Sequence, residues 1–366
     1  MASPASAISN LAWAMLPRLL GASKNTQSLF FSPLSIVVAL SLLTGAAEDD
    51  TKKKLLEKLG VHRDEELQSI SSLINSSGSS MTSSVSVANA IFADKSFTVF
   101  DDYKTFLEGF HAEFIQYSNL AEEVDGINSW ISDKTEGLIQ NMLSKSLLRN
   151  SHTVIVNALA FKGSWENKFD ERYTQSVAFH LSKEERRSVR MMYLQNTKIW
   201  CRLTPTYDAV RLPCGTSETS NNGISLVAYL PKAESSFEEV IDTIKVEGVK
   251  PLDDVFSKSK YNQFGFPRFE ILGDYTLKAS LRELGFPVDQ AFPHMGTGDC
   301  FVEEVVHKAF VKVDEKGTTA AAATAVMMKR SRPQNQTILI FDRPFIFSIM
   351  ANDSGTIIFT GIYYGD

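Results

Sequence analysis

Residues Glu315 to Pro333 read Glu-Lys-Gly-Thr-Thr-Ala-Ala-Ala-Ala-Thr-Ala-Val-Met-Met-Lys-Arg-Ser-Arg-Pro, and this stretch decides how the whole chain is interpreted. Three ordinary interpretations fit it: a short alanine-rich helix, a low-complexity linker, or a basic patch for nucleic acid. In an extended chain, however, alternate residues share a face. One such face carries no charge and could join an existing sheet as a new strand; it consists of Thr318, Ala320, Ala322, Thr324, Val326 and Met328.

The run before this stretch, Val305 to Val313, has the alternation of a strand. β-Branched residues and a period of two predict a half-buried strand here. The apolar face holds Val305, His307, Ala309, Val311 and Val313. A histidine on such a face is expected to be a buried residue with satisfied hydrogen bonds.

The composition is that of an ordinary globular protein. Charged residues make up 22% and hydrophobic residues 43% of 366 residues, so a large core can be buried. The formal net charge of −6 argues against a general nucleic-acid binder and leaves the basic residues near 330 as a local feature.

The number of cysteines and the N-terminal sequence indicate in which cellular compartment the protein is expected. Three cysteines are too few for a disulfide framework, so we expect free buried thiols and a reducing compartment. Met1 to Asn10 lacks the basic region of a signal peptide. The uncharged run Leu29 to Ala47 contains Pro33 and several hydroxyl residues, which favour a strand end and a buried helix over a membrane span.

Periodicity predicts alternating helices and strands along the rest of the chain. The expected helices are Ala7 to Leu20, Leu34 to Leu43, Thr51 to Leu59, Asp101 to Phe114, Ile127 to Leu143, and Tyr275 to Leu284 with Asp274 as its N-cap. The expected strands are Ser84 to Phe92, Val154 to Trp165 in the middle of a sheet, Val189 to Met192, Ile224 to Pro231, Phe264 to Phe269, and a hairpin of Phe345 to Met350 with Thr356 to Tyr363.

Several motifs, in the correct order, resemble those of the serpin family, which are serine protease inhibitors. They are the hinge Glu315 to Ala323, Phe31 to Ile36, Asn157 to Trp165, Phe341 to Phe347 and Ile358 to Gly361. The resemblance covers nearly the whole chain and implies a mixed α/β (α+β) fold in a single domain, residues 1–366. In that fold, helices pack around a large central sheet and two further sheets, and residues 315–338 form an exposed reactive-centre loop.

The resemblance also implies which residues act. The hinge that lets the loop enter the central sheet would comprise Glu315, Gly317, Thr318, Ala320, Ala321, Ala322 and Ala323. A buried polar cluster behind the point where that sheet opens would comprise Ser32, Ser35, Asn157 and His307. A serine protease would cut the loop and be trapped as an acyl-enzyme while the loop inserts as an extra strand.

The reactive bond has more than one candidate. The usual loop length of the family places the cut after Ser331, which favours an elastase-like protease. The pairing of arginine with the aspartate of a trypsin-like primary pocket favours Arg330-Ser331. We prefer Arg330, with Ser331 and Arg332 as contenders and Lys329 as a subsite contact.

Other chemistry is not indicated. The sequence lacks a Gly-x-Ser-x-Gly elbow, a His-Glu-x-x-His helix and a phosphate-binding loop, and the spacing of His294, Cys300 and His307 fits no common zinc pattern. The resemblance implies an inhibitor rather than an enzyme, and we expect it to be monomeric and to use no metal, cofactor, nucleic acid or membrane. The chain resembles the ovalbumin-like serpins, which implies a cytoplasmic location or export without a signal peptide, so an extracellular location is possible. The alternative function is a non-inhibitory carrier, chaperone or storage serpin.

Overall fold

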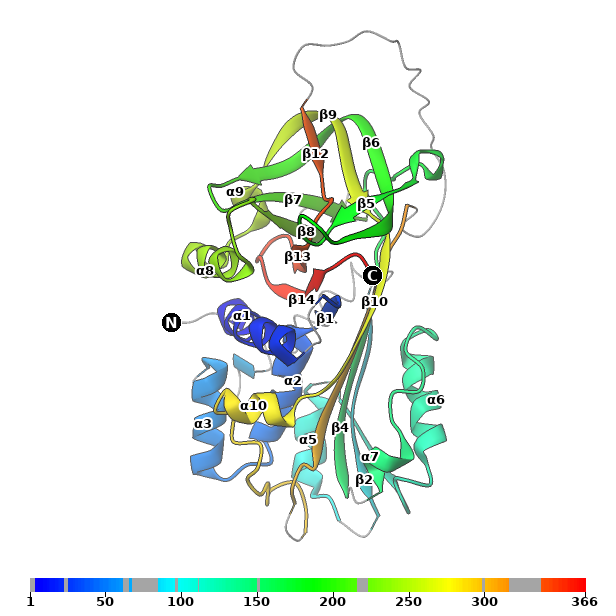
Figure 1. Cartoon of the computed structure of the whole chain (residues 1–366). Coiled ribbons are helices and arrows are strands. Elements are labelled where there is room, and N and C mark those ends of the chain that lie inside the picture. Colours follow the sequence, from blue (N-terminus) through cyan, green and yellow to red (C-terminus); the bar gives the residue numbers. More distant parts are fainter. Residues whose placement is uncertain are drawn as a thin grey trace.

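The computed structural model describes residues 4–22, 26–61, 66–67, 85–95, 98–110, 112–149, 152–215, 223–297, 300–315 and 337–366. These residues form helices and two sheets in a mixed α/β arrangement (Figure 1).

A five-stranded sheet has the order β10-β11-β4-β2-β3. Its strands are β10 (Phe269–Thr276), β11 (Glu304–Val313), β4 (Thr153–Lys162), β2 (Val85–Asp94) and β3 (Glu113–Tyr117). β4 lies in the middle, as its almost continuous apolar sequence predicted, and is buried on both faces except at Lys162. β11 and β4 are parallel, whereas β10–β11 and β2–β4 are antiparallel.

The larger sheet has nine strands. In order they are β1 (Leu29–Phe31), β14 (Ile357–Tyr363), β13 (Phe345–Ala351), β8 (Ile224–Pro231), β7 (Tyr207–Cys214), β6 (Arg186–Leu203), β9 (Ser257–Pro267) and β12 (Ile338–Ile340), with β5 (Gln175–His180) on the start of β6. β6 pairs with β5 and β9 and then, through Trp200 to Leu203, with β7. The resemblance implied two further sheets besides the central one. In the structure the long strand β6 joins them into this single nine-stranded sheet.

The helices lie mainly around the five-stranded sheet. They are α1 (Pro4–Ala22), α2 (Pro33–Thr44), α3 (Asp49–Leu59), α5 (Asp101–Glu108), α6 (Val124–Lys134), α7 (Lys145–Leu148), α8 (Phe237–Glu247), α9 (Leu252–Val255), α10 (Lys278–Glu283) and the 3₁₀ turn η1 (Glu171–Tyr173). Every residue of α2 is buried, as its uniformly apolar sequence predicted. Ser32 caps α2 by accepting a hydrogen bond from Ser35 N, and Pro33 occupies the first turn.

The two faces of the five-stranded sheet are covered differently. On one face α6 and the chain after it form a separate apolar cluster with β2 and β4, which includes Ile127, Ile131, Val154 and Val156. On the other face α2 belongs to the main core, which continues into the nine-stranded sheet. Figure 1 shows α6 and α2 on opposite sides of these strands. The strand Val305 to Val313 is therefore buried on most of both faces rather than half buried.

Two predicted helices are too long. The helix expected over Asp101 to Phe114 ends at Glu108, and Glu113 and Phe114 instead begin β3, which pairs with β2. The helix expected over Ile127 to Leu143 ends at Lys134. There the Thr135 hydroxyl bonds the Ile131 carbonyl at 2.8 Å, and the next two residues adopt positive φ angles of 52° and 76°, which a helix cannot continue.

The helix expected over Tyr275 to Leu284 begins later than predicted, at Lys278. Tyr275 belongs to β10, because its main chain pairs with β11 opposite His307. Asp274 is therefore not an N-cap; it forms an ion pair with Lys308 across the two strands, with 2.9 Å between Oδ2 and Nζ.

Two further predictions concern the thiols and the membrane. Cys201, Cys214 and Cys300 are all buried thiols outside any disulfide, which confirms the expectation for them. In the described part of the chain, no helix has both the length and the apolar character that crossing a bilayer requires.

Candidate sheet-opening site and loop anchors

The four residues of the expected polar cluster meet behind the junction of β4 and β11. Ser32 and Ser35 stand at the start of α2, Asn157 on β4 and His307 on β11, and none is more than 1% exposed. Asn157 and His307 are direct register partners in the parallel pair. The helix cap, the middle strand and β11 thus place all four side chains at one point.

Hydrogen bonds connect this cluster across the two strands. His307 Nδ1 lies 2.7 Å from Asn157 Oδ1, and Ser32 N donates to His307 Nε2 at 3.0 Å. Because Nε2 accepts, the proton resides on Nδ1, which donates to the amide oxygen. Ser35 Oγ also donates to Asn157 Oδ1, so one side-chain oxygen joins α2, β4 and β11.

Sequence reasoning missed a fifth member, Asn89. The Asn157 amide Nδ2 donates to Asn89 Oδ1 at 2.6 Å and to Ser35 O at 3.2 Å. Asn89 lies on β2 directly opposite Asn157 and is 9% exposed. The sequence did contain a signal for Asn89, since it is a lone amide within a mostly apolar strand. A buried amide requires hydrogen-bond partners, which predicts a polar neighbour for it.

Burial keeps the histidine neutral. The enclosure of His307 lowers its pKa to about 3, since the charged ring loses its hydration. Both ring nitrogens are already bonded, so His307 has no lone pair left for a metal ion.

The β4–β11 pair is a seam suited to a new strand. The two strands run parallel over nine register pairs, from Glu304–Val154 to Lys312–Lys162. A strand entering between them, turning back from the end of β11, would run antiparallel to both and could form two antiparallel ladders. Its entry would have to break the His307–Asn157 hydrogen bond.

The first residue of the expected hinge, Glu315, is held firmly. Its side chain is 2% exposed, accepts from Thr174 Oγ1 at 2.7 Å and pairs with Arg268 Nη1 at 3.3 Å. The Phe169 amide donates to Glu315 O at 3.2 Å. One residue earlier, Trp165 Nε1 donates to the Asp314 carbonyl at 2.6 Å. Sequence reasoning did not assign these anchoring roles.

The other end of the segment is anchored on the nine-stranded sheet. The Asn262 amide donates to Thr337 O at 2.9 Å, and the Thr337 amide donates to Asn262 Oδ1 at 3.0 Å. β12 then pairs with β9 in parallel from Ile338 onward. The remaining predicted residues lie outside the described residues: Gly317, Thr318, Ala320, Ala321, Ala322, Ala323, Lys329, Arg330, Ser331 and Arg332.

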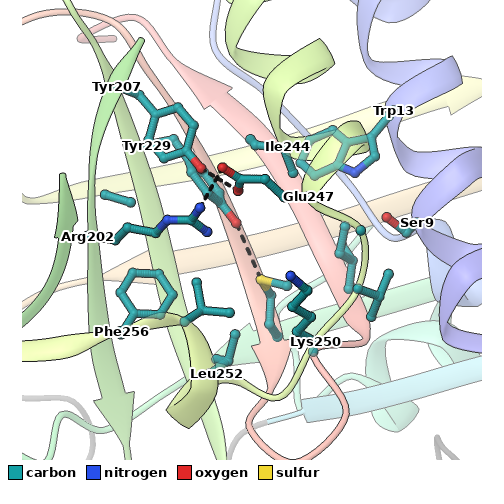
Figure 2. A pocket seen from close by; sticks show the side chains of 17 residues that line it. Ser9, Trp13, Arg202, Tyr207, Tyr229, Ile244, Glu247, Lys250, Leu252 and Phe256 are labelled. Atoms are coloured by element: carbon teal, nitrogen blue, oxygen red, sulfur yellow. Dashed lines mark hydrogen bonds and ion pairs between the residues drawn. The ribbon is translucent and has the colours of Figure 1, made fainter. Parts of the chain in front are cut away.

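A separate pocket lies between α1, α8 and the nine-stranded sheet. It encloses about 550 Å³ including its open mouth. Figure 2 shows Arg202 and Tyr207 pointing at Glu247 inside it, with Trp13 on the side of α1. Arg202 Nη2 lies 2.6 Å from Glu247 Oε1, and the Tyr207 hydroxyl donates to Oε2 at 2.8 Å. The pocket is thus lined mainly by apolar side chains, together with the Arg202–Glu247 pair and Lys250.

Comparison with known proteins agrees with this geometry. The family model Serpin, described as serine protease inhibitor, matches residues 6–365. Human serpin B8 is 30% identical over 362 residues, covering 94% of each chain. Human leukocyte elastase inhibitor is 30% identical, with 91% of this chain and 92% of that protein covered. The solved structure of Arabidopsis AtSerpin1, in its native stressed conformation, matches with a TM-score of 0.84 at 26% identity over 98% of this chain and 97% of that one. The chain therefore belongs to the serpin family of serine protease inhibitors.

Proposed function

We propose that the protein inhibits a trypsin-like serine protease as a suicide substrate. The protease would attack Arg330, forming an ester between its serine Oγ and the Arg330 carbonyl carbon. The Arg330–Ser331 peptide bond breaks, and the Ser331 amine leaves with a proton. The freed segment then enters the seam between β4 and β11 before the ester is hydrolysed.

The observation that carries this proposal is the seam. Parallel β4 and β11 offer nine register pairs, and Glu315 is fixed directly after β11. Residues 319–328 supply ten residues without a charge or proline, which match that length. A charge there would be buried at high cost.

Specificity for trypsin-like proteases rests on Arg330. Cutting after Ser331 would instead suit an elastase-like enzyme, and four relatives of this chain are named leukocyte elastase inhibitors. Lys329 and Arg332 provide further basic positions.

The test is to mix the protein with trypsin at equal molarity and separate the products on a denaturing gel. We expect a band slightly below the summed masses, because the C-terminal fragment leaves the denatured complex. That fragment should begin at Ser331, as measured by mass spectrometry. Arg330→Ala should abolish the complex, whereas the matched control Arg332→Ala should keep it. Clean cleavage without a complex would refute inhibition, and a fragment that begins at Arg332 would move the reactive bond to Ser331.

A second candidate function is a carrier of a small apolar ligand, favoured by the pocket around Trp13 and Glu247. A carrier need not insert its loop, so cleavage in the loop should leave its heat resistance unchanged. An inhibitor that stores strain should become far more heat-resistant once cleaved. Melting curves of intact and cleaved protein separate the two functions. A cytoplasmic location, a monomeric state and a single domain stay predictions.

A further inference from the structure

One pair of strands in the nine-stranded sheet carries only positive charge. β6 contains five arginine and lysine residues and β9 contains two lysines, and neither strand has an aspartate or a glutamate. The whole chain, by contrast, has a formal net charge of −6. Lys198 on β6 with Lys258 and Lys260 on β9 are exposed neighbours within this pair of strands. These three residues form the lysine cluster.

The strand register places the lysine cluster on one outer face. Lys198 is directly opposite Lys260, and Lys258 is opposite Trp200, two positions further along each strand. Lys258 Nζ lies 4.7 Å from the centroid of the Trp200 ring. Successive side chains of a strand point to opposite faces. The intervening Ile199 is buried, so the three lysines point away from the core.

The charges of the lysine cluster are not balanced by carboxylates in the described part of the chain. The acidic residues nearest to it in sequence are Asp253 and Asp254 on α9. Asp253 pairs with Arg211, and no ion pair joins Asp254 to the lysine cluster. Like charges directly opposite one another destabilise a sheet, so the Lys198–Lys260 pair is unfavourable in the isolated protein. An approaching acidic surface removes this repulsion.

The lysine cluster lies beside the point where the chain re-enters the sheet after residue 336. Thr337 is bonded to Asn262 through two hydrogen bonds, and Asn262 is two positions from Lys260 on β9. Figure 1 shows β6, β9 and β12 together at one end of the molecule, away from α3 and α7. Arg330 precedes Thr337 by seven positions, a stretch that spans about 25 Å at most.

This distance brings a bound protease over the lysine cluster. A globular protease domain of ~220 residues is about 40 Å across, which exceeds the reach of the seven residues. A protease that attacks Arg330 therefore turns the surface around its active site towards β6 and β9. A free polyanion would match the positive charge equally well, but it has no need of a position beside Thr337.

We propose that the lysine cluster is a docking surface for an acidic patch beside the active site of the target protease. This inference rests on the proposed function and narrows the target to trypsin-like proteases whose surface is acidic there. The lysine cluster speeds the encounter by electrostatic steering and takes no part in bond exchange. The reactive bond still decides where the chain is cut.

The test measures association with trypsin whose catalytic serine is replaced by alanine, so that docking is observed without ester formation. An anionic and a cationic isoform of this trypsin serve as probes. At about 0.05 M salt, Lys198→Gln/Lys258→Gln/Lys260→Gln should slow association of the anionic isoform about tenfold. Association of the cationic isoform should not be slowed. At about 0.5 M salt the Debye length is about 4 Å, and the difference for the anionic isoform should fall below threefold.

Two matched variants separate a local effect from the total charge. Lys53→Gln/Lys54→Gln/Lys145→Gln removes the same charge from exposed positions on α3 and α7 and should change the association rate by less than twofold. Lys198→Arg/Lys258→Arg/Lys260→Arg keeps the charge of the lysine cluster and should keep the wild-type rate.

Wild type alone provides a measurement that does not depend on the folding of any variant. Repulsion between the net charge of −6 and the anionic isoform would make association faster as salt is added, because salt screens repulsion. Attraction by the lysine cluster makes association slower instead. We expect a fall of about fivefold between about 0.05 M and 0.5 M salt. A rise would overturn the proposal.

The remaining outcomes are equally decisive. Equal slowing in the control with substitutions on α3 and α7, equal slowing of both isoforms, or no binding of the anionic isoform to wild type would overturn the docking surface. Retention on heparin that depends on the lysine cluster, with unchanged association of both isoforms, would assign these residues to a polyanion and overturn the protease as partner. If active trypsin forms no stable complex, the proposed function fails, while the association rates still decide the docking surface.

Discussion

The neutral, buried His307 predicts that acid destabilises the folded protein through this residue. Its pKa is lowered to about 3 by burial, whereas a histidine in the unfolded chain takes up its proton near 6.5. Between these values the unfolded state binds more protons, so stability rises with pH and falls on acidification. The contribution is fully present above pH 6.5 and is lost progressively as the pH falls towards 3.

The magnitude follows from the two pKa values. At pH 5, one and a half units below the unfolded value, the loss from this single site is about 2 kcal/mol. His307→Gln serves as the comparison, because glutamine can both donate and accept a hydrogen bond but takes up no proton.

The assay is urea unfolding followed by tryptophan fluorescence at pH 7, 6 and 5 for both proteins. Other titrating groups are shared, so the difference between the two pH profiles isolates His307. We expect wild type to lose about 2 kcal/mol more than the variant between pH 7 and 5. Parallel profiles would show that His307 is not held neutral by burial, which would refute the account of the cluster.

Three further predictions concern the anchors and the fold. Arg268→Ala leaves the buried Glu315 carboxylate without its ion pair and should cost about 1–2 kcal/mol in urea unfolding; an unchanged midpoint would contradict the anchoring role. Gly361→Ala places a Cβ 2.2 Å from Leu29 O, so β1 must move. The free energy of unfolding should fall by about 3 kcal/mol or more in the same assay. A free energy equal to that of wild type would show instead that the strands adjust to the added methyl group. Ser236→Ala removes the capping box of α8 and should cost about 1 kcal/mol. Complex formation with trypsin should stay unchanged in Ser236→Ala, because α8 lies beside the nine-stranded sheet and away from β4 (Figure 1). A loss of the complex in this variant would contradict that separation.

Elements with a regular apolar pattern could be predicted from the sequence. The apolar residues of α2 and β4 predicted elements buried on all sides, and both are. Ser32, Ser35, Asn157 and His307 were grouped through the resemblance to serpins. Their residue types alone do not show that β4 and β11 are neighbours, because pairing between distant strands leaves no local trace.

The parts that sequence reasoning missed depend on contacts between distant residues. Arg268 pairs with Glu315 across 47 positions, and nothing around Arg268 marks it as an anchor. The start of α10 was misplaced because Tyr275 and Thr276 pair with β11, and this tertiary pairing overrides local helix propensity. Asp274 precedes the expected helix and so resembled an N-cap, but its carboxylate forms an ion pair with Lys308.

The pairing of β1 with β14 has a consequence for how the protein is made. β1 lies near the start of the chain, yet its partner strand ends at Tyr363, and Ser28 is bonded to Asp366, 338 positions away. A ribosome makes the chain from the N-terminus, so Leu29 to Phe31 wait for almost the entire synthesis before their partner strand β14 emerges. During that time β1 and the part of α2 that contacts β14 lack that strand as a neighbour. Completion of the nine-stranded sheet is therefore a post-translational event, and a chain that ends before Ile357 lacks the strand that pairs with β1.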